Sequence, residues 1–133
     1  MNNDYSTEMR IQGIRRYAVN FSVATAFPSV STTGYRTLVF LLHSDFSGAS
    51  KSMLVEVQHS DDNTTFDNTG VQTTFSGSDA LNSFHVLVDT NRVKQYVRLR
   101  VTPAASQGVS CSAILFNETT VPDANITVSN AVL

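Results

Sequence analysis

Residues 53–66 read MLVEVQHSDDNTTF, an alternating run that ends in a polar cluster and restarts at an aromatic residue. Strict alternation places Met53, Val55 and Val57 on one face of a strand and the residues between them on the other face. The Ser, Asp and Asn side chains of residues 60–63 can hydrogen-bond their own backbone, which stabilises a turn. The stretch therefore predicts a β-hairpin.

Similar runs recur at intervals of about ten residues, separated by turn signals. The apolar run at residues 38–42 indicates a strand buried on both faces. Residues 95–102 alternate cleanly, and Pro103 ends the run. The predicted strands are residues 35–43, 52–59, a short one near Phe66, 71–75, 84–88, 95–102 and 109–116. At most one short helix is expected, around residues 78–83.

Short strands at this spacing are typical of a single-domain, all-β antiparallel sandwich. Two sheets packed face to face would bury the odd-numbered residues of 97–101 against those of 109–115. The strand order stays open between a jelly roll and an immunoglobulin-like fold. The predicted organisation is an extended N-terminal arm at residues 1–33, a β-sandwich core at residues 34–117 and a C-terminal tail at residues 118–133.

Composition limits the classes of partner. The chain has 133 residues, a net charge of -2 and a pI of about 5.8, so no nucleic-acid partner is expected. No apolar window is long enough to cross a bilayer, so no membrane partner is expected either. The polar, acidic residues 1–5 do not resemble a signal peptide, which predicts synthesis in a cytosol without export.

The hairpin turn carries oxygen-bearing side chains at alternate positions, as calcium loops do. These residues are Asp61, Asn63, Thr65 and Asp67. The position that requires glycine is Phe66, and the position of the bidentate glutamate is Gln72. We therefore interpret the cluster as a turn held by backbone hydrogen bonds and predict no metal site.

No other pattern points to catalysis or to a cofactor. His43, His59 and His85 lie near strand ends and lack metal-ligand spacing. Cys111 alternates with serines among apolar residues, so it is expected to be a buried, inert thiol. No strained-serine turn, phosphate-binding loop or dinucleotide motif is present in the sequence. We predict a non-enzymatic protein; a hydrolase using a scattered Ser/His pair is the weaker hypothesis.

The two predicted arms carry isolated apolar residues on otherwise polar chain. Such anchors allow an extended segment to lie along a partner. The predicted interface residues are Tyr5, Met9, Ile11, Phe21 and Phe27 in the N-terminal arm and Ile126, Val128 and Leu133 in the C-terminal tail. The alternative is that the arms are ordinary disordered termini.

Two segments resemble small structural proteins encoded in the morphogenesis regions of tailed bacteriophages. Residues 55–66, VEVQHSDDNTTF, are similar to the v-x-hydrophobic-Q-x-SDD-x-T-F hairpin of those proteins. Residues 94–102, KQYVRLRVT, and 110–115, SCSAIL, are similar to their R/Q-Y-hydrophobic-R-hydrophobic strand and small-residue last strand. The resemblance covers about residues 35–117, and the leading arm matches nothing in it.

The resemblance implies a capsid decoration, or cement, protein on the exterior of the virion head, made in the host bacterial cytoplasm. Its partners would be the major capsid protein and further copies of itself. A trimer is preferred because capsid lattices offer three-fold positions at which a ring interface closes. The alternative is a receptor- or glycan-binding module of a tail fibre or baseplate, with exposed aromatics such as Tyr35 or Phe46 in a loop-end cleft.

Overall fold

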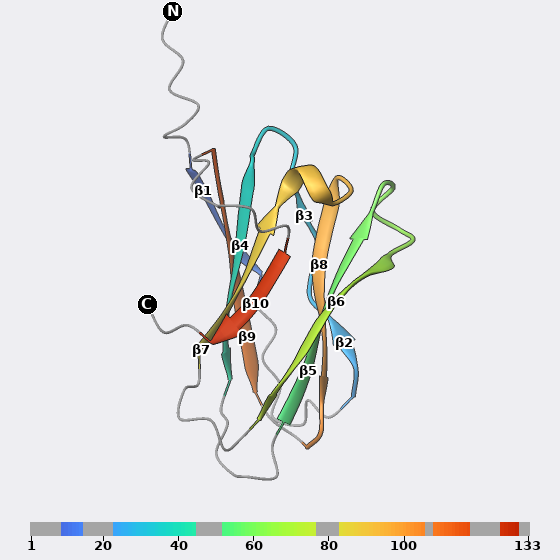
Figure 1. Cartoon of the computed structure of the whole chain (residues 1–133), viewed down its shortest axis with the longest axis vertical. Helices are drawn as coiled ribbons and strands as arrows, with labels where there is room; N and C mark the ends of the chain where they lie inside the picture. Colours follow the sequence, from blue (N-terminus) through green and yellow to red (C-terminus); the bar gives the residue numbers. More distant parts are fainter. Residues whose placement is uncertain are drawn as a thin grey trace, which may run out of the picture.

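The computed structural model describes residues 9–14, 23–44, 52–76, 83–105, 108–117 and 126–130. These residues form two antiparallel sheets that pack face to face (Figure 1), which confirms the predicted all-β sandwich. Sheet A contains, in spatial order, β1 (Met9–Ile14), β9 (Val109–Phe116), β4 (Thr37–Ser44), β7 (Ser83–Asp89) and β10 (Ile126–Asn130). Sheet B contains β2 (Thr25–Ala26), β8 (Tyr96–Pro103), β5 (Ser52–Ser60) and β6 (Asp67–Ser76), and β3 (Val30–Ser31) also pairs with β8.

The strands pair in a nested order. β5 pairs with β6 across the turn at residues 61–66, β4 pairs with β7, β2 and β3 pair with β8, and β1 pairs with β9. The chain therefore pairs as one long hairpin, bent at the turn that the sequence predicts and rolled into two layers. This arrangement is the jelly-roll topology, so the strand order favours the jelly roll over the immunoglobulin-like alternative.

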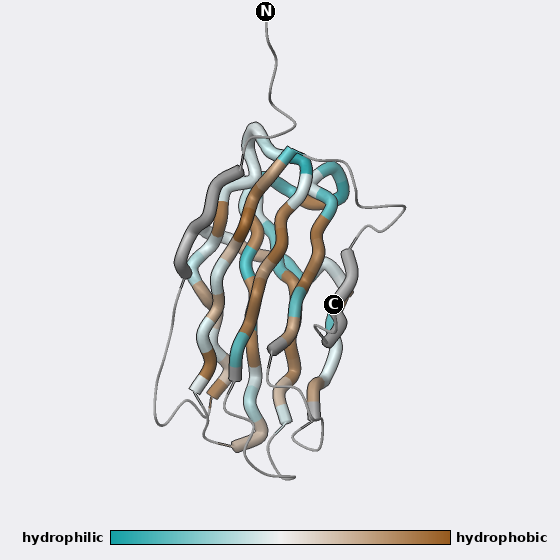
Figure 2. The backbone as a smooth tube through the Cα atoms, turned by 90° about the vertical axis from the view of Figure 1, so that its left-hand side faces the viewer, coloured by the Kyte–Doolittle hydropathy of each residue, from teal (hydrophilic) through white to brown (hydrophobic). Residues whose placement is uncertain are grey.

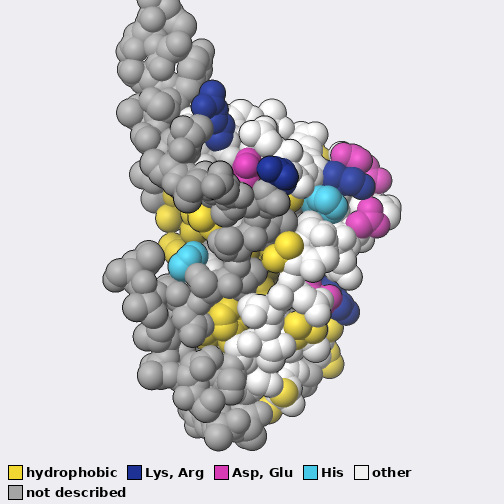
Figure 3. Space-filling view, viewed as in Figure 1, with side chains coloured by type: hydrophobic (Ala, Val, Ile, Leu, Met, Phe, Trp, Pro, Cys, Tyr) yellow, Lys and Arg dark blue, Asp and Glu magenta, His cyan; other side chains and the backbone are white. Residues whose placement is uncertain are grey.

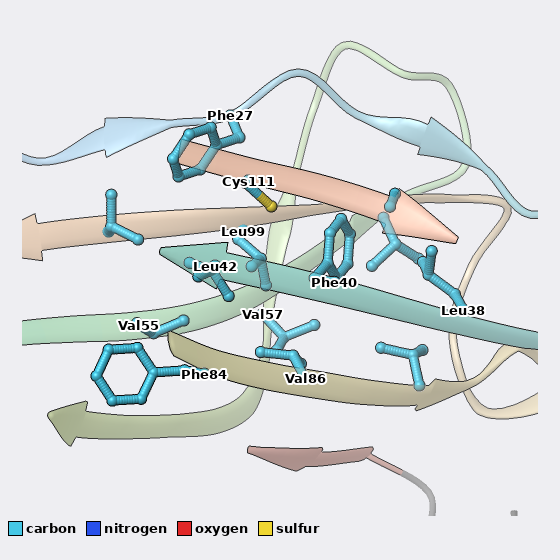
Figure 4. Packing of buried hydrophobic residues seen from close by; sticks show 14 of the residues in the cluster. Phe27, Leu38, Phe40, Leu42, Val55, Val57, Phe84, Val86, Leu99 and Cys111 are labelled. Carbon is cyan, nitrogen blue, oxygen red and sulfur yellow. The ribbon is translucent and has the colours of Figure 1, made fainter. Parts of the chain in front are cut away.

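The core lies between the two sheets and is built by the alternation of the strands. In β8, Val97, Leu99 and Val101 are fully buried while the residues between them are partly exposed. The odd-numbered residues of β9 face them and are 0–2% exposed, as predicted. Figure 4 shows Leu42, Leu99 and other side chains from both sheets pointing into this shared interior.

A pair of aromatic rings links β6 and β7. The ring centroids of Phe75 and Phe84 lie 3.8 Å apart in a stacked arrangement. The chain passes from sheet B to sheet A between these two residues. The stacked pair therefore helps to close the sandwich at the point where the chain changes layer.

The sheets extend beyond the predicted domain boundaries at both ends. β1, β2 and β3 lie within the predicted N-terminal arm, and β10 lies within the predicted C-terminal tail. Phe27 is 2% exposed and its backbone N–H donates to the carbonyl of Leu99 at 2.9 Å, so it belongs to the core and not to an arm. These strands are not predictable from the sequence, because a short edge strand is held by backbone hydrogen bonds and does not require a long alternation of apolar and polar residues.

Two smaller expectations have different outcomes. The predicted strands near Phe66 and at residues 71–75 belong to one strand, β6, which carries an irregularity opposite Val57. Gly70 lies there with φ of 90°, a left-handed conformation that glycine adopts without steric cost. Of the expected helix, residues 78–82 lie outside the described residues and Ser83 begins β7; a 3-10 turn, η2 (Thr90–Arg92), follows β7.

Candidate interaction surfaces

The outer side of sheet A carries a group of apolar residues among polar ones, although an antiparallel sheet with one face on the core usually has a polar outer face. In β4, Leu38, Phe40 and Leu42 point into the core, so the residues between them point outward. The outward residues of β4, β7 and β9 that form what we call the apolar face are Val39, Leu41, Leu87, Ile114 and Phe116. Figure 2, which faces sheet A, shows long hydrophobic stretches along its central strands.

Strand register joins three residues of the apolar face, whereas Leu41 lies between His85 of β7 and Ser112 of β9. Val39 lies opposite Ile114 of β9 and opposite Leu87 of β7, which places three apolar residues side by side across three strands. Leu41 is 40% exposed and the other four are half-buried. The expectation that residues 38–42 are buried on both faces is therefore wrong for Leu41, because its side of sheet A does not face the core.

The predicted interface residues divide into three groups. Met9 and Ile11 lie in β1, in register with Phe116 and Ile114 of the apolar face. Phe27 is in the core, as described above. Ile126 and Val128 lie in β10, in register with two core valines of β7. The remaining predicted residues, Tyr5, Phe21 and Leu133, lie outside the described residues.

The hairpin turn is held by hydrogen bonds to the side chains of Ser60 and Asp62. Asp62 Oδ1 accepts hydrogen bonds from the backbone N–H of Thr64 at 2.9 Å and of Thr65 at 2.8 Å, and from Ser60 Oγ at 2.8 Å. The backbone donors of Thr65 and then Thr64 lower the pKa of Asp62 from 3.8 to about 2. The predicted turn is therefore confirmed, and it is stabilised by Asp62 together with Ser60, whose Oγ accepts from the backbone N–H of Asp62 and Asn63; neither Ser60 nor Asp62 is among the calcium-like positions.

A charged cluster lies beside this turn. Lys94 Nζ is 3.2 Å from Asp67 and 3.7 Å from Asp61, and the hydrogen bond to Asp67 is the main cause of its raised pKa. His59 Nδ1 accepts a hydrogen bond from the backbone N–H of Lys94 at 3.2 Å. Figure 3 shows acidic, basic and histidine side chains gathered at the corner of the molecule formed by the hairpin end. Within the described ranges, no group of three metal-binding side chains is arranged to hold an ion.

The outer side of sheet B carries a ladder of polar pairs. Arg100 Nη1 donates to Glu56 Oε1 at 3.1 Å, and Arg98 Nε donates to Gln58 Oε1 at 2.9 Å. Glu56 and Gln58 are only 9% and 8% exposed although they point away from the core. The guanidinium carbon of Arg98 lies 3.8 Å from the centroid of the Phe66 ring. Desolvation, followed by the charge of Arg100, lowers the pKa of Arg98.

Cys111 and Tyr35, two residues considered for a functional role, are both buried or partly buried. Cys111 is 2% exposed and burial raises its thiol pKa, which confirms the prediction of a buried thiol. Tyr35 is partly buried and packs against the core, so it is not an exposed aromatic platform. In the part of the chain that the structure describes, no helix is long and apolar enough to span a bilayer.

Comparison with known proteins identifies similar folds. No protein-family model and no curated protein sequence matches the chain. The structure is similar to that of YomS, a protein derived from the SPBc2 prophage, with a TM-score of 0.54 and 14% identity over 81% of this chain and 92% of that chain.

Two viral structures show a more distant likeness. Chains in the structures of infectious bursal disease virus strains Gt and Gx have TM-scores of 0.45 and 0.46 and identities of 11% and 14%. They are covered over 35% and 36% of their length, so this chain spans about a third of them. At these identities the similarity concerns the fold. The chain thus shares its two-sheet β-sandwich with a prophage-derived protein.

Proposed function

We propose that this chain is a non-enzymatic virion protein that decorates the outside of a mature phage head and bridges major capsid subunits. The observation that supports the proposal most directly is the apolar face of sheet A. Contiguous apolar surface on a soluble protein commonly marks a protein–protein contact. The fold likeness to a prophage-derived protein supports a phage context for that contact.

A decoration protein needs a rigid body and contact surfaces, and it needs no active site. A protein that binds the expanded capsid lattice, and not the unexpanded one, stabilises the expanded state by mass action. Many identical contacts around the shell act together, because each copy that spans two subunits makes its second contact at a high effective concentration. The jelly roll of this chain, with its buried core and the apolar face on the outer side of sheet A, provides a body and a contact surface of this kind.

In this proposal the apolar face lies against the capsid, and the β1 edge extends the contact surface. Met9 and Ile11 are paired with residues of the apolar face and would take part in the contact. Tyr5, Phe21 and Leu133 would reach further over neighbouring subunits. Self-association as a trimer around a three-fold lattice position is part of the same proposal.

The proposal is tested by adding the purified chain to phage heads that lack it and separating bound from free protein by sedimentation. We expect saturable binding to expanded heads, at a fixed number of copies per capsid subunit, and no binding to unexpanded heads. Failure to bind either form would contradict the proposal.

The contribution of the residues before β1 to head binding can be tested with a short N-terminal truncation. Removing residues 1–27 would also remove β1, β2 and the buried Phe27, and would therefore damage the core. A truncation of residues 1–8 preserves all described strands. Weaker head binding by this shorter protein, with unchanged thermal stability, would support a role for the residues before β1.

The receptor- or glycan-binding alternative has less support. It requires exposed aromatic side chains, and Tyr35 packs against the core. Phe46, the other aromatic side chain considered for it, lies outside the described residues. No feature of the described surface favours this function over capsid decoration.

A further inference from the structure

Cations on the outer side of sheet B differ in how their charge is balanced. Lys94, just before β8, is 3.2 Å from Asp67 and 3.7 Å from Asp61, and Arg100 is 3.1 Å from Glu56. Arg98, between them, faces the neutral amide of Gln58. Among the described residues, no carboxylate lies within ion-pair distance of Arg98. Arg98 is therefore the cation of this row that has no counter-charge in the described part of the chain.

The Arg98 side chain is nevertheless held in place. Its Nε donates to Gln58 Oε1 at 2.9 Å, and Gln58 is fixed in turn by donating Nε2 to Asn68 Oδ1 at 2.9 Å. The guanidinium lies over the Phe66 ring, 3.8 Å from its centroid. A guanidinium packed on a ring keeps its in-plane donors available, and the two terminal nitrogens of Arg98 have no partner among the described residues.

The lowered pKa of Arg98 agrees with this geometry. Its causes are desolvation and the nearby charge of Arg100, with no compensating acidic group. The cation is thus partly desolvated and repelled by a neighbour before any partner arrives. A partner carboxylate would offset both effects, and because the side chain is already positioned, little conformational entropy would be lost on binding.

We propose that Arg98 is a binding site for a carboxylate side chain on a protein subunit of the phage head. This inference rests on the proposed decoration function and identifies a second contact of it. A carboxylate matches the planar donor fork of arginine, and such charge-assisted pairs are among the strongest polar contacts. A nucleic-acid backbone is disfavoured because it requires several free cations, and Lys94 and Arg100 are already neutralised.

The position of Arg98 has a consequence for bridging. Arg98 lies on the outer side of sheet B, whereas the apolar face lies on the outer side of sheet A, so the two contacts are on opposite layers of the sandwich (Figure 1). One copy could therefore contact one capsid subunit through its apolar face and a different subunit through Arg98. In this arrangement each copy of the protein would cross-link two capsid subunits in addition to covering the capsid surface.

The test compares head binding by Arg98→Gln and Arg92→Gln, which remove the same charge. Arg92 is exposed in η2, outside the polar ladder, and is the matched control. We expect Arg98→Gln to bind expanded heads about ten- to a hundredfold more weakly than the wild type, and Arg92→Gln to bind normally. Arg98→Lys should also be weakened, because it keeps the charge but loses the planar fork. Circular dichroism would verify that every variant is folded.

Two further measurements identify the partner group. Amidation of the carboxylates on the heads should weaken wild-type binding and should leave the residual binding of Arg98→Gln unchanged. Sedimentation velocity of the free protein should give the same oligomeric state for the wild type and Arg98→Gln. A change in that state would assign the carboxylate to a second copy of the chain and overturn the assignment to the head.

The outcomes separate this inference from the proposed function. If the wild type fails to bind heads, both are overturned. If the wild type binds and the affinity of Arg98→Gln is within about twofold of the wild-type affinity, only the inference about Arg98 is overturned. A twofold difference is well below the tenfold that corresponds to 1.4 kcal/mol. Unchanged wild-type binding after amidation of the heads would likewise overturn the carboxylate assignment alone.

Discussion

Truncation of Leu41 to alanine should weaken binding of the protein to phage heads while leaving it folded. Leu41 is the most exposed residue of the apolar face, at 40%. Full burial of a leucine side chain contributes about 1.5–3 kcal/mol. If docking covers the exposed 40% of Leu41, that fraction contributes about 0.6–1.2 kcal/mol of binding free energy. Its loss corresponds to an increase in Kd of about three- to eightfold.

The same truncation also has a cost for folding. The part of Leu41 that is already covered contributes the remainder of its burial energy, about 1–2 kcal/mol, to the free energy of unfolding. A domain of this size typically has about 5–15 kcal/mol of stability, so the variant should remain folded. A charged replacement, Leu41→Asp, should weaken binding more, because docking would then bury an unpaired carboxylate.

The assay is co-sedimentation with heads that lack the protein, with thermal unfolding measured in parallel. Val23→Ala is the control, since Val23 is 68% exposed, precedes β2 and belongs neither to the apolar face nor to the polar ladder of sheet B. We expect head binding by Val23→Ala to match the wild type. Unchanged binding by both Leu41→Ala and Leu41→Asp, or an equal loss in Val23→Ala and Leu41→Ala, would refute the assignment of the apolar face as the docking surface.

Three further predictions concern the fold. The pKa of Asp62 is lowered from 3.8 to about 2, so its stabilising contribution is complete above pH 3.8 and is lost as the pH falls through about 2. The Tm values of the wild type and Asp62→Asn should therefore converge over that range, and parallel curves would show that the ionised carboxylate does not stabilise the turn. Cys111 should resist thiol reagents at neutral pH and react once urea unfolds the protein, because it is 2% exposed and burial raises its pKa; rapid labelling of the native protein would contradict the buried position. Gly70→Ala should lower the free energy of unfolding by about 1–3 kcal/mol in urea titrations, because an added methyl group meets no neighbour but a φ of 90° strains any other residue; an unchanged midpoint would argue against the left-handed conformation.

Local patterns in the sequence predict the inner strands because each of those strands alternates between the core and the outside. The alternation at residues 96–103 and 109–116 translates directly into one buried and one partly exposed face. The turn is predictable for a similar reason, since Ser60 and Asp62 bond to nearby backbone groups. Such interactions depend on neighbours in the chain and leave a readable pattern.

The edges of the sheets and the strand order depend on distant partners. β1 pairs with β9, near the other end of the chain, and β10 pairs with β7 through backbone groups that every residue possesses. The sequence therefore indicates apolar residues in these segments without indicating that they belong to sheets. Phe27 illustrates the difference, because an isolated aromatic residue has the same pattern whether it fills a core or contacts a partner.

The apolar face is not predictable from the sequence, for a related reason. The apolar run at residues 38–42 fits a strand covered on both faces, and only the structure distinguishes the core side from the outer side. An apolar run of this kind is also expected for a strand whose outer side is covered by another protein. Val39 and Leu41 are therefore visible as apolar residues in the sequence, but their role as surface residues is not.

The copy number of this protein in purified virions, measured by quantitative mass spectrometry against the major capsid protein, shows whether it decorates the phage head. We expect a ratio near one, or a simple fraction of one, because each lattice position would hold the same number of copies. A handful of copies per particle would indicate a tail or fibre component and contradict decoration. Complete absence from virions would contradict any structural role in the particle.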